Sequence, residues 1–77
     1  MNHTSVPLND EQTTCLLIHG FCILAEEFGN HTCHLMNVGD VVFLEGGQKN
    51  YRTVIVAKQL KDANRPSGPA FLVANLY

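Results

Sequence analysis

Cysteines and histidines gather in the first half of the chain, which makes metal binding the first chemistry to consider. Zinc is held in proteins by four ligands, mostly thiolates and imidazoles, arranged as a tetrahedron. The spacing of these residues matches no zinc finger or zinc ribbon, and the chain contains no Cys-x-x-Cys pair. If the first apolar segment is a strand, Cys15 and His19 share one face while Cys22 points the other way. A metal-stabilised domain therefore stays an alternative, and we expect no bound cofactor. The candidate ligands of that alternative are Cys15, His19, Cys22, His31, Cys33 and His34.

A catalytic pair of cysteine and histidine is the second chemistry that these residues suggest. A histidine activates many nucleophilic cysteines, but the fold brings the two together, not their positions along the chain. The sequence has no nucleophile elbow and no glycine-rich phosphate loop. A domain of 77 residues also leaves little room for a deep pocket. We therefore predict that the protein is not an enzyme and has no catalytic residue.

The composition describes one small globular domain. The 77 residues are 45% apolar and 16% charged, with a formal net charge of −2. A chain this apolar is able to bury enough surface to fold, so disorder is not expected. No apolar run reaches the length of a transmembrane helix, and residues 1–12 lack the pattern of a signal peptide. Five Lys and Arg residues against seven Asp and Glu are too few for a dedicated nucleic-acid binder. We expect that the protein binds neither a membrane nor a specific nucleic-acid sequence. We also expect its cysteines to be reduced thiols in the cytosol.

The stability of so short a chain is expected to be marginal. Burial of apolar surface contributes on the order of 110 kcal/mol, and ordering the chain costs about the same. The three cysteines do not form a disulfide framework that would add to this balance. We therefore expect that contacts in an oligomer stabilise the working state of the protein.

The first half of the chain divides into a polar arm and one apolar segment. Residues 1–13 are polar and predict a flexible N-terminal arm ahead of a single domain over residues 14–77. The run TCLLIHGFCIL is apolar at nearly every position, which favours a buried strand at 14–23 and a turn or helical turn at 25–28. In a helix, Gly20 would lie inside the element at a cost of about 1 kcal/mol. That alternative helix would carry an apolar stripe formed by Leu17, Phe21, Leu24 and Phe28.

The second half of the chain predicts three β-strands in succession. The sequence Val-Gly-Asp is typical of a turn and stands directly before the β-branched run 41–44. Two glycines separate this run from a second strand at 51–57, so the two form a hairpin. A loop with prolines and a glycine at 61–69 precedes a third strand at 70–76. The fold class is therefore mainly β: a small antiparallel β-barrel or curled sheet with a three-strand C-terminal meander and a flexible N-terminal arm. The expected core positions, or else their neighbours on the opposite face, are Val42, Leu44, Val54, Val56, Phe71 and Val73.

The order of these elements resembles a known family. The stretch HLMNVGDVVFLEGGQKNYRTVIVAKQLKDANRPSGPAFLVANLY places a Gly-Asp turn, a strand, a polar hairpin loop, a second strand, a Pro- and Gly-bearing loop and a final apolar strand in succession. In this order it is similar to the head–tail joining proteins of lambda-like tailed phages and to small tail-completion proteins. The preceding LLIHGFCILAEEF resembles the family's earlier strand with its acidic turn. The resemblance covers residues 16–77, and the chain is shorter than the lambda-type proteins.

The resemblance implies a structural protein of the virion, assembled in the host cytoplasm. Members of the family form rings at the neck between the head and the tail, and they carry out no chemistry. The implied partners are other copies of the chain, the head connector and tail proteins. Contacts in the family are made by loops and by the N-terminal arm. Carried onto this chain, the implied interface residues are Glu45, Gln48, Lys49, Asn50, Lys61, Asp62, Asn64 and Arg65. A small β-barrel module that binds a host protein is the other alternative.

Overall fold

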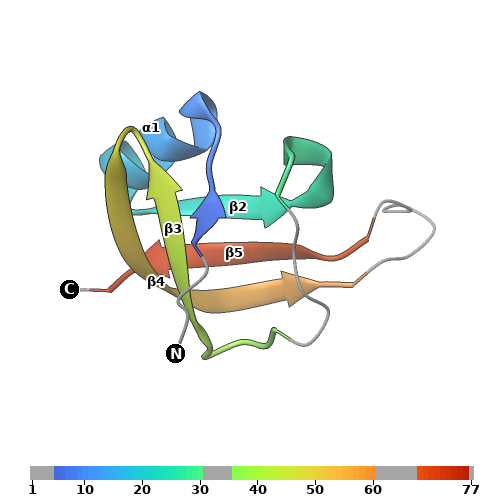
Figure 1. Ribbon diagram of the computed structural model, residues 1–77. Helices are drawn as coiled ribbons and strands as arrows, with labels where there is room; N and C mark the ends of the chain where they lie inside the picture. The colour runs from blue at the N-terminus through green and yellow to red at the C-terminus, as the bar shows by residue number, and fades with distance from the viewer. Residues whose placement is uncertain (1–4, 31–35, 61–67, 77) are drawn as a thin grey trace.

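Figure 1 shows the computed structural model of the protein, which describes residues 5–30, 36–60 and 68–76. Half of the described residues lie in strands and 22% in helices, so the prediction of a mainly β fold is confirmed. Within these ranges no helix has the length and hydrophobicity of a membrane span. The elements in chain order are β1 (Val6–Pro7), α1 (Asp10–His19), β2 (Phe21–Ala25), the 3-10 helix η1 (Glu26–Phe28), β3 (Val41–Gly46), β4 (Lys49–Gln59) and β5 (Ala70–Asn75).

All five strands belong to one mixed sheet that curls into a half-barrel. The strand order is β1-β3-β4-β5-β2, in which β1 runs parallel to β3 and the other neighbours are antiparallel. Strand β4 pairs with β3 along its first half and with β5 along its second half, and Figure 1 shows it bending between the two. A register shift between Ile55 and Ala57 adds to this bend, as β-bulges do. The predicted hairpin and C-terminal meander are confirmed, with β4 longer than expected.

The core lies on the concave side of the sheet, under α1. Four of the six expected core residues are buried there, because β3 and β5 direct alternate side chains inward. In β4 the opposite-face alternative applies: Thr53 and Ile55 are buried in the core instead of Val54 and Val56. The curl of the sheet decides which face of β4 becomes concave, and both faces carry β-branched residues. The core cluster consists of Leu16, Cys22, Leu24, Val42, Leu44, Ile55, Phe71 and Val73.

The expected strand at 14–23 is wrong for most of its length, because helix α1 occupies it up to His19. The helix begins with a capping box, in which the Asn9 side chain accepts from the Gln12 N–H and the Gln12 side chain accepts from the Asn9 N–H. It ends at Gly20, whose φ of 84° is the left-handed conformation of a helix C-cap. Gly20 therefore lies at the junction of a helix and a strand. Strand β2 and η1 follow, and the predicted turn at 25–28 is confirmed.

The expected N-terminal arm over residues 1–13 is also wrong in its C-terminal part. Strand β1 pairs with β3, and α1 has begun by Asp10. The Leu8 N–H donates to the carbonyl oxygen of Glu45 at 2.8 Å, which extends the contact beyond β1. The polar composition suggested a flexible arm, but the side chains of Asn9 and Gln12 form the capping box of α1. Residues 1–4 lie outside the described part of the chain.

A pair of buried amides connects the two edges of the half-barrel. Asn30 is 1% exposed and follows η1. Its Oδ1 accepts from Gln12 Nε2 at 2.6 Å and from the Ala25 N–H at 3.1 Å. Its Nδ2 donates to the carbonyl oxygen of Pro7 in β1 at 2.9 Å. One side chain therefore ties α1, the end of β2 and β1 together.

Candidate functional site

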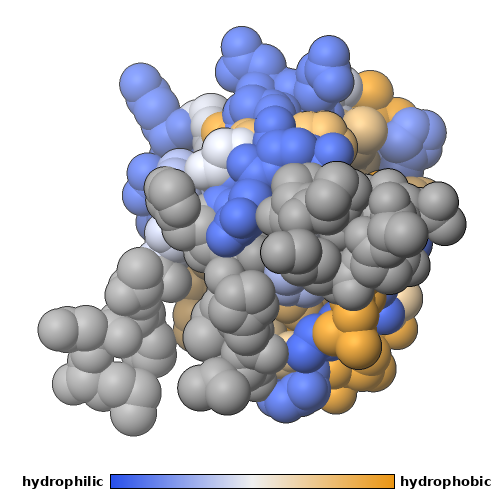
Figure 2. Space-filling model, turned by 90° about the vertical axis from the view of Figure 1, so that its right-hand side faces the viewer, coloured by the Kyte–Doolittle hydropathy of each residue, from blue (hydrophilic) through white to orange (hydrophobic). Residues whose placement is uncertain are grey.

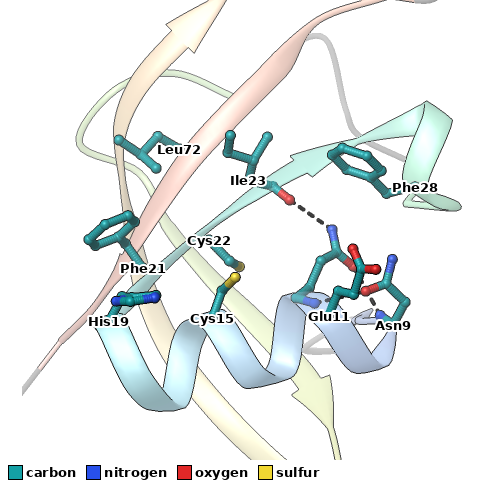
Figure 3. Close-up of a pocket in the computed structure, with 10 residues that line it drawn as sticks. Asn9, Glu11, Cys15, His19, Phe21, Cys22, Ile23, Phe28 and Leu72 are labelled. Atoms are coloured by element: carbon teal, nitrogen blue, oxygen red, sulfur yellow. Dashed lines mark hydrogen bonds between the residues drawn. The ribbon is translucent and has the colours of Figure 1, made fainter.

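An open groove of about 250 Å³ runs between α1 and β2. Figure 3 shows its lining residues: Glu11, Cys15 and His19 stand along the helix, and Phe21 and Ile23 stand along the strand. The helix residues are spaced by four positions, so they lie on one face. Phe28 and Leu72 complete the apolar wall. On either side of Gly20, which joins the two elements, the rings of His19 and Phe21 lie 5.9 Å apart.

The groove follows the free edge of β2, which the sheet leaves without a neighbouring strand among the described residues. The Asn75 N–H donates to Gly20 O at 2.9 Å, so by antiparallel alternation the backbone groups of Phe21, Ile23 and Ala25 point outward to this edge. Amide side chains cover part of it. Gln12 Nε2 donates to Ile23 O at 2.7 Å, and Asn30 bonds both backbone groups of Ala25. The Phe21 end of the edge lies in the open part of the groove.

The convex side of the sheet, which we call the outer sheet face, is apolar across four strands. Cross-strand pairing aligns Val41, Val54, Ala74 and Phe21 in one row, and it aligns Ala57, Leu72 and Ile23 in a second row. Phe21 and Ile23 are 49% and 50% exposed. In Figure 2 the apolar side chains gather along the right-hand edge, which is the side turned away from the viewer in Figure 1. Because Phe21 and Ile23 also line the groove, the groove and the outer sheet face form one continuous apolar surface.

Helix α1 carries a separate exposed apolar pair. Leu17 and Ile18 are 59% and 70% exposed. Leu16 points into the core, so Ile18 lies about 200° around the helix axis from it and faces away from the sheet. The molecule therefore exposes apolar side chains on two different sides.

Two of the predicted metal ligands, Cys15 and Cys22, lie next to each other because residue 15 belongs to a helix and not to the expected strand. The helix places Cys15 on the side of α1 that faces β2, and Cys22 on β2 points back toward it (Figure 3). Cys22 is buried and Cys15 is exposed. Burial raises the pKa of the Cys22 thiol from 9.0 to about 11, and a charge on the neighbouring Cys15 adds to the increase.

The described residues contain no group of three or more His, Cys, Asp or Glu side chains placed to hold a metal ion. His19 stacks beside Phe21 and does not complete a ligand set with the two cysteines. The other three candidates, His31, Cys33 and His34, lie outside the described residues. The metal-stabilised alternative therefore gains no support from the part of the site that the structure describes.

The predicted interface residues of the hairpin lie together at the turn between β3 and β4. This tip consists of Glu45, Gln48, Lys49 and Asn50, all of which are exposed. The backbone of the tip is held against the helix, because Gly46 approaches Thr13 so closely that a Cβ would overlap its hydroxyl. Lys61, Asp62, Asn64 and Arg65 lie outside the described residues, so their predicted role stays a prediction.

The surface residues Phe21, Ile23 and Leu72 were not predicted, because a strand that is apolar at every position is expected to be buried on both faces. The sequence of β2 indicates that one of its apolar faces is exposed. Its apolar residues occupy both faces, and the core needs only Cys22 and Leu24. An edge strand with two apolar faces in a single-layer sheet must expose one of them.

Comparisons with known proteins return no match: no family model, no curated protein and no solved structure is similar to the chain.

Proposed function

We propose that this protein is a non-enzymatic structural subunit that self-assembles through its outer sheet face. The supporting observation is the continuous apolar surface formed by two cross-strand rows and the groove beside β2. Large contiguous apolar patches on a small domain are typical of protein interfaces. The marginal stability expected of so short a chain adds to this argument, because assembly stabilises the folded state by mass action.

The arrangement of the apolar residues favours a ring over a two-fold dimer. A two-fold contact uses the same patch on both subunits, whereas a head-to-tail contact joins two different patches and closes into a ring when the rotation fits. The outer sheet face and the Leu17–Ile18 pair of α1 are two such patches on different sides of the molecule. We infer that one subunit presents the outer sheet face to the α1 patch of the next.

At the level of biology, we propose that the ring belongs to the head–tail junction of a tailed phage, between the head connector and the tail. This proposal rests on the resemblance of residues 16–77 to head–tail joining proteins. The exposed hairpin tip, Glu45 and Gln48–Asn50, supports it as a polar contact for the neighbouring ring. The virion is then the site of action, and assembly takes place in the host cytoplasm.

The self-assembly proposal is tested by sedimentation velocity on two variants. Ile23→Lys places a charge on the outer sheet face, and Ile18→Lys places one on α1. Each variant alone is expected to lose the ring. An equimolar mixture is expected to form a dimer, because each variant retains the patch that the other has lost. Thr14→Lys is the matched control, since it adds the same charge at an exposed polar position of α1.

The outcomes separate the possible assemblies. If only Ile23→Lys disrupts the oligomer, the contact is two-fold and the ring is wrong. If the unmodified chain stays monomeric at every concentration, self-assembly through this face is wrong. The position of the coding sequence in its genome tests the phage assignment separately. A place between connector or capsid genes and tail genes supports it, and a place among early regulatory genes contradicts it.

The groove favours a second candidate function, a module that binds an extended segment of a host protein. The Phe21 end of the β2 edge lies open beside an apolar groove, which is the arrangement that strand addition uses. A monomeric chain that captures one host protein at fixed stoichiometry, and loses it on Phe21→Lys, would support this candidate over the ring.

A further inference from the structure

We propose that Cys15 and Cys22 form a reversible dithiol–disulfide couple that clamps α1 to the edge strand β2. The two residues are separated by six positions and come from different elements, so the fold has to bring their thiols together. Figure 3 shows the Cys15 side chain rising from α1 and the Cys22 side chain descending from β2, with the sulfurs facing one another. Both line the same groove, and a charge on Cys15 acts on Cys22. The couple is independent of the proposed self-assembly.

The structure gives the two thiols different roles. A disulfide requires the two Cβ atoms to approach with their side chains directed at each other, and this pair has that direction. Cys15 is exposed at the groove, so it is the thiol that an outside reagent reaches. Cys22 is 4% exposed, and its sulfur faces that of Cys15 (Figure 3). Cys15 is therefore the attacking thiol and Cys22 the resolving thiol.

The reaction partner is a low-molecular-weight disulfide of the glutathione class. The Cys15 thiolate attacks one sulfur of the disulfide, which forms a mixed disulfide and releases one glutathione thiolate. Cys22 then loses its proton to water, and its thiolate attacks the Cys15 sulfur and releases the second glutathione thiolate. The two protein thiols lose two electrons and two protons in total, and the glutathione disulfide becomes two glutathione molecules. Burial keeps the Cys22 thiol protonated at neutral pH, so the second step is expected to become faster at higher pH.

The disulfide would fix the width of the groove and would stabilise the attachment of α1 to β2. In the dithiol state, the helix is held to β2 by the burial of Leu16 and by the bond from Gln12 Nε2 to Ile23 O. A disulfide would add a covalent link between the middle of α1 and the second residue of β2. It would fix the width of the groove at the point where the strand edge is open.

The test uses a chain in which Cys33, which lies outside the described residues, is replaced by Ser. This Cys33→Ser chain is equilibrated with buffers of glutathione and glutathione disulfide, quenched with acid and weighed by mass spectrometry. The expected product has lost two hydrogen atoms and carries a disulfide bond between Cys15 and Cys22. Adding Cys22→Ala is expected to leave one glutathione attached at Cys15. Adding Cys15→Ala is expected to leave Cys22 unmodified in the folded chain.

A comparison with the chain unfolded in urea tests whether the fold brings the pair together. Short flexible chains hold their ends at millimolar effective concentrations. The effective concentration of the two thiols is expected to be at least about tenfold higher in the folded chain, which by linkage corresponds to about 1.4 kcal/mol of added stability in the oxidised form. A folded Cys33→Ser chain that keeps glutathione on Cys15 without forming the link would overturn the proposal. Equal effective concentrations in the folded and unfolded chains would overturn it as well.

Discussion

Replacing Asn30 tests whether one buried amide holds the half-barrel closed. In Asn30→Ala, the Ala25 N–H and the Pro7 carbonyl lose their partner, and Gln12 loses its bond of 2.6 Å. Ala25 is 1% exposed, so water does not replace the lost bond to its N–H. A typical net loss is about 1 kcal/mol for each of the three bonds, and a buried group without a partner adds to it. We expect the free energy of unfolding to fall by about 3–4 kcal/mol.

The assay is urea denaturation followed by far-ultraviolet circular dichroism. Asn50→Ala at the exposed hairpin tip is the control and is expected to change the free energy of unfolding by less than about 0.5 kcal/mol. A double-mutant cycle with Gln12→Ala is expected to give a coupling energy of about 1 kcal/mol or more, since the two amides bond each other. A loss below about 1 kcal/mol in Asn30→Ala, with no coupling to Gln12, would refute the reasoning that this network joins α1, β2 and β1.

The remaining predictions concern single contacts in the core and at the hairpin. Gly46→Ala is expected to lower the free energy of unfolding by about 1–3 kcal/mol, because the added Cβ would overlap the Thr13 hydroxyl; Thr13→Ala in the same chain should restore part of the loss in urea denaturation. Between pH 9 and 11, the free energy of unfolding of the unmodified chain is expected to fall by about 2 kcal/mol relative to that of Cys22→Ala. The reason is that the Cys22 thiol keeps its proton in the folded chain and has lost it in the unfolded chain. Parallel curves of the free energy of unfolding against pH for the two chains would contradict this. Thr53→Val is expected to cost about 1 kcal/mol by thermal denaturation, because the buried Thr53 hydroxyl donates to the Val42 carbonyl at 2.8 Å; an unchanged melting temperature would count against that bond.

The C-terminal meander was predictable because its signals are local. Strand β3 begins with an apolar run, β4 carries four consecutive β-branched residues at 53–56, and glycines mark the turn between them. A turn and a β-branched run are properties of a few consecutive positions, so they can be recognised without knowledge of the rest of the fold.

The first half of the chain was harder to predict because two local signals competed. An apolar run favoured a strand, while Asn9 and Gln12 formed a capping box that favoured a helix. Gly20 was interpreted as an interruption, although as a C-cap it allows a helix and a strand to follow each other directly. With α1 in place, Cys15 and Cys22 face each other. A strand would have turned them apart.

The sequence by itself determined that the protein is a small, mainly β domain with a hairpin and a third strand, because turn residues and β-branched runs act over short distances. Only the tertiary structure decided which apolar faces are buried. The sheet curls so that Ile55 enters the core and Val56 does not, and it leaves the second face of β2 exposed. The burial of Asn30 was likewise decided by the tertiary structure. In the sequence it is a polar residue after a turn, which is typical of a loop, and the fold places α1, β1 and β2 around it. Burial depends on partners from distant parts of the chain, and those partners create the apolar surface and the cysteine pair on which the proposals rest.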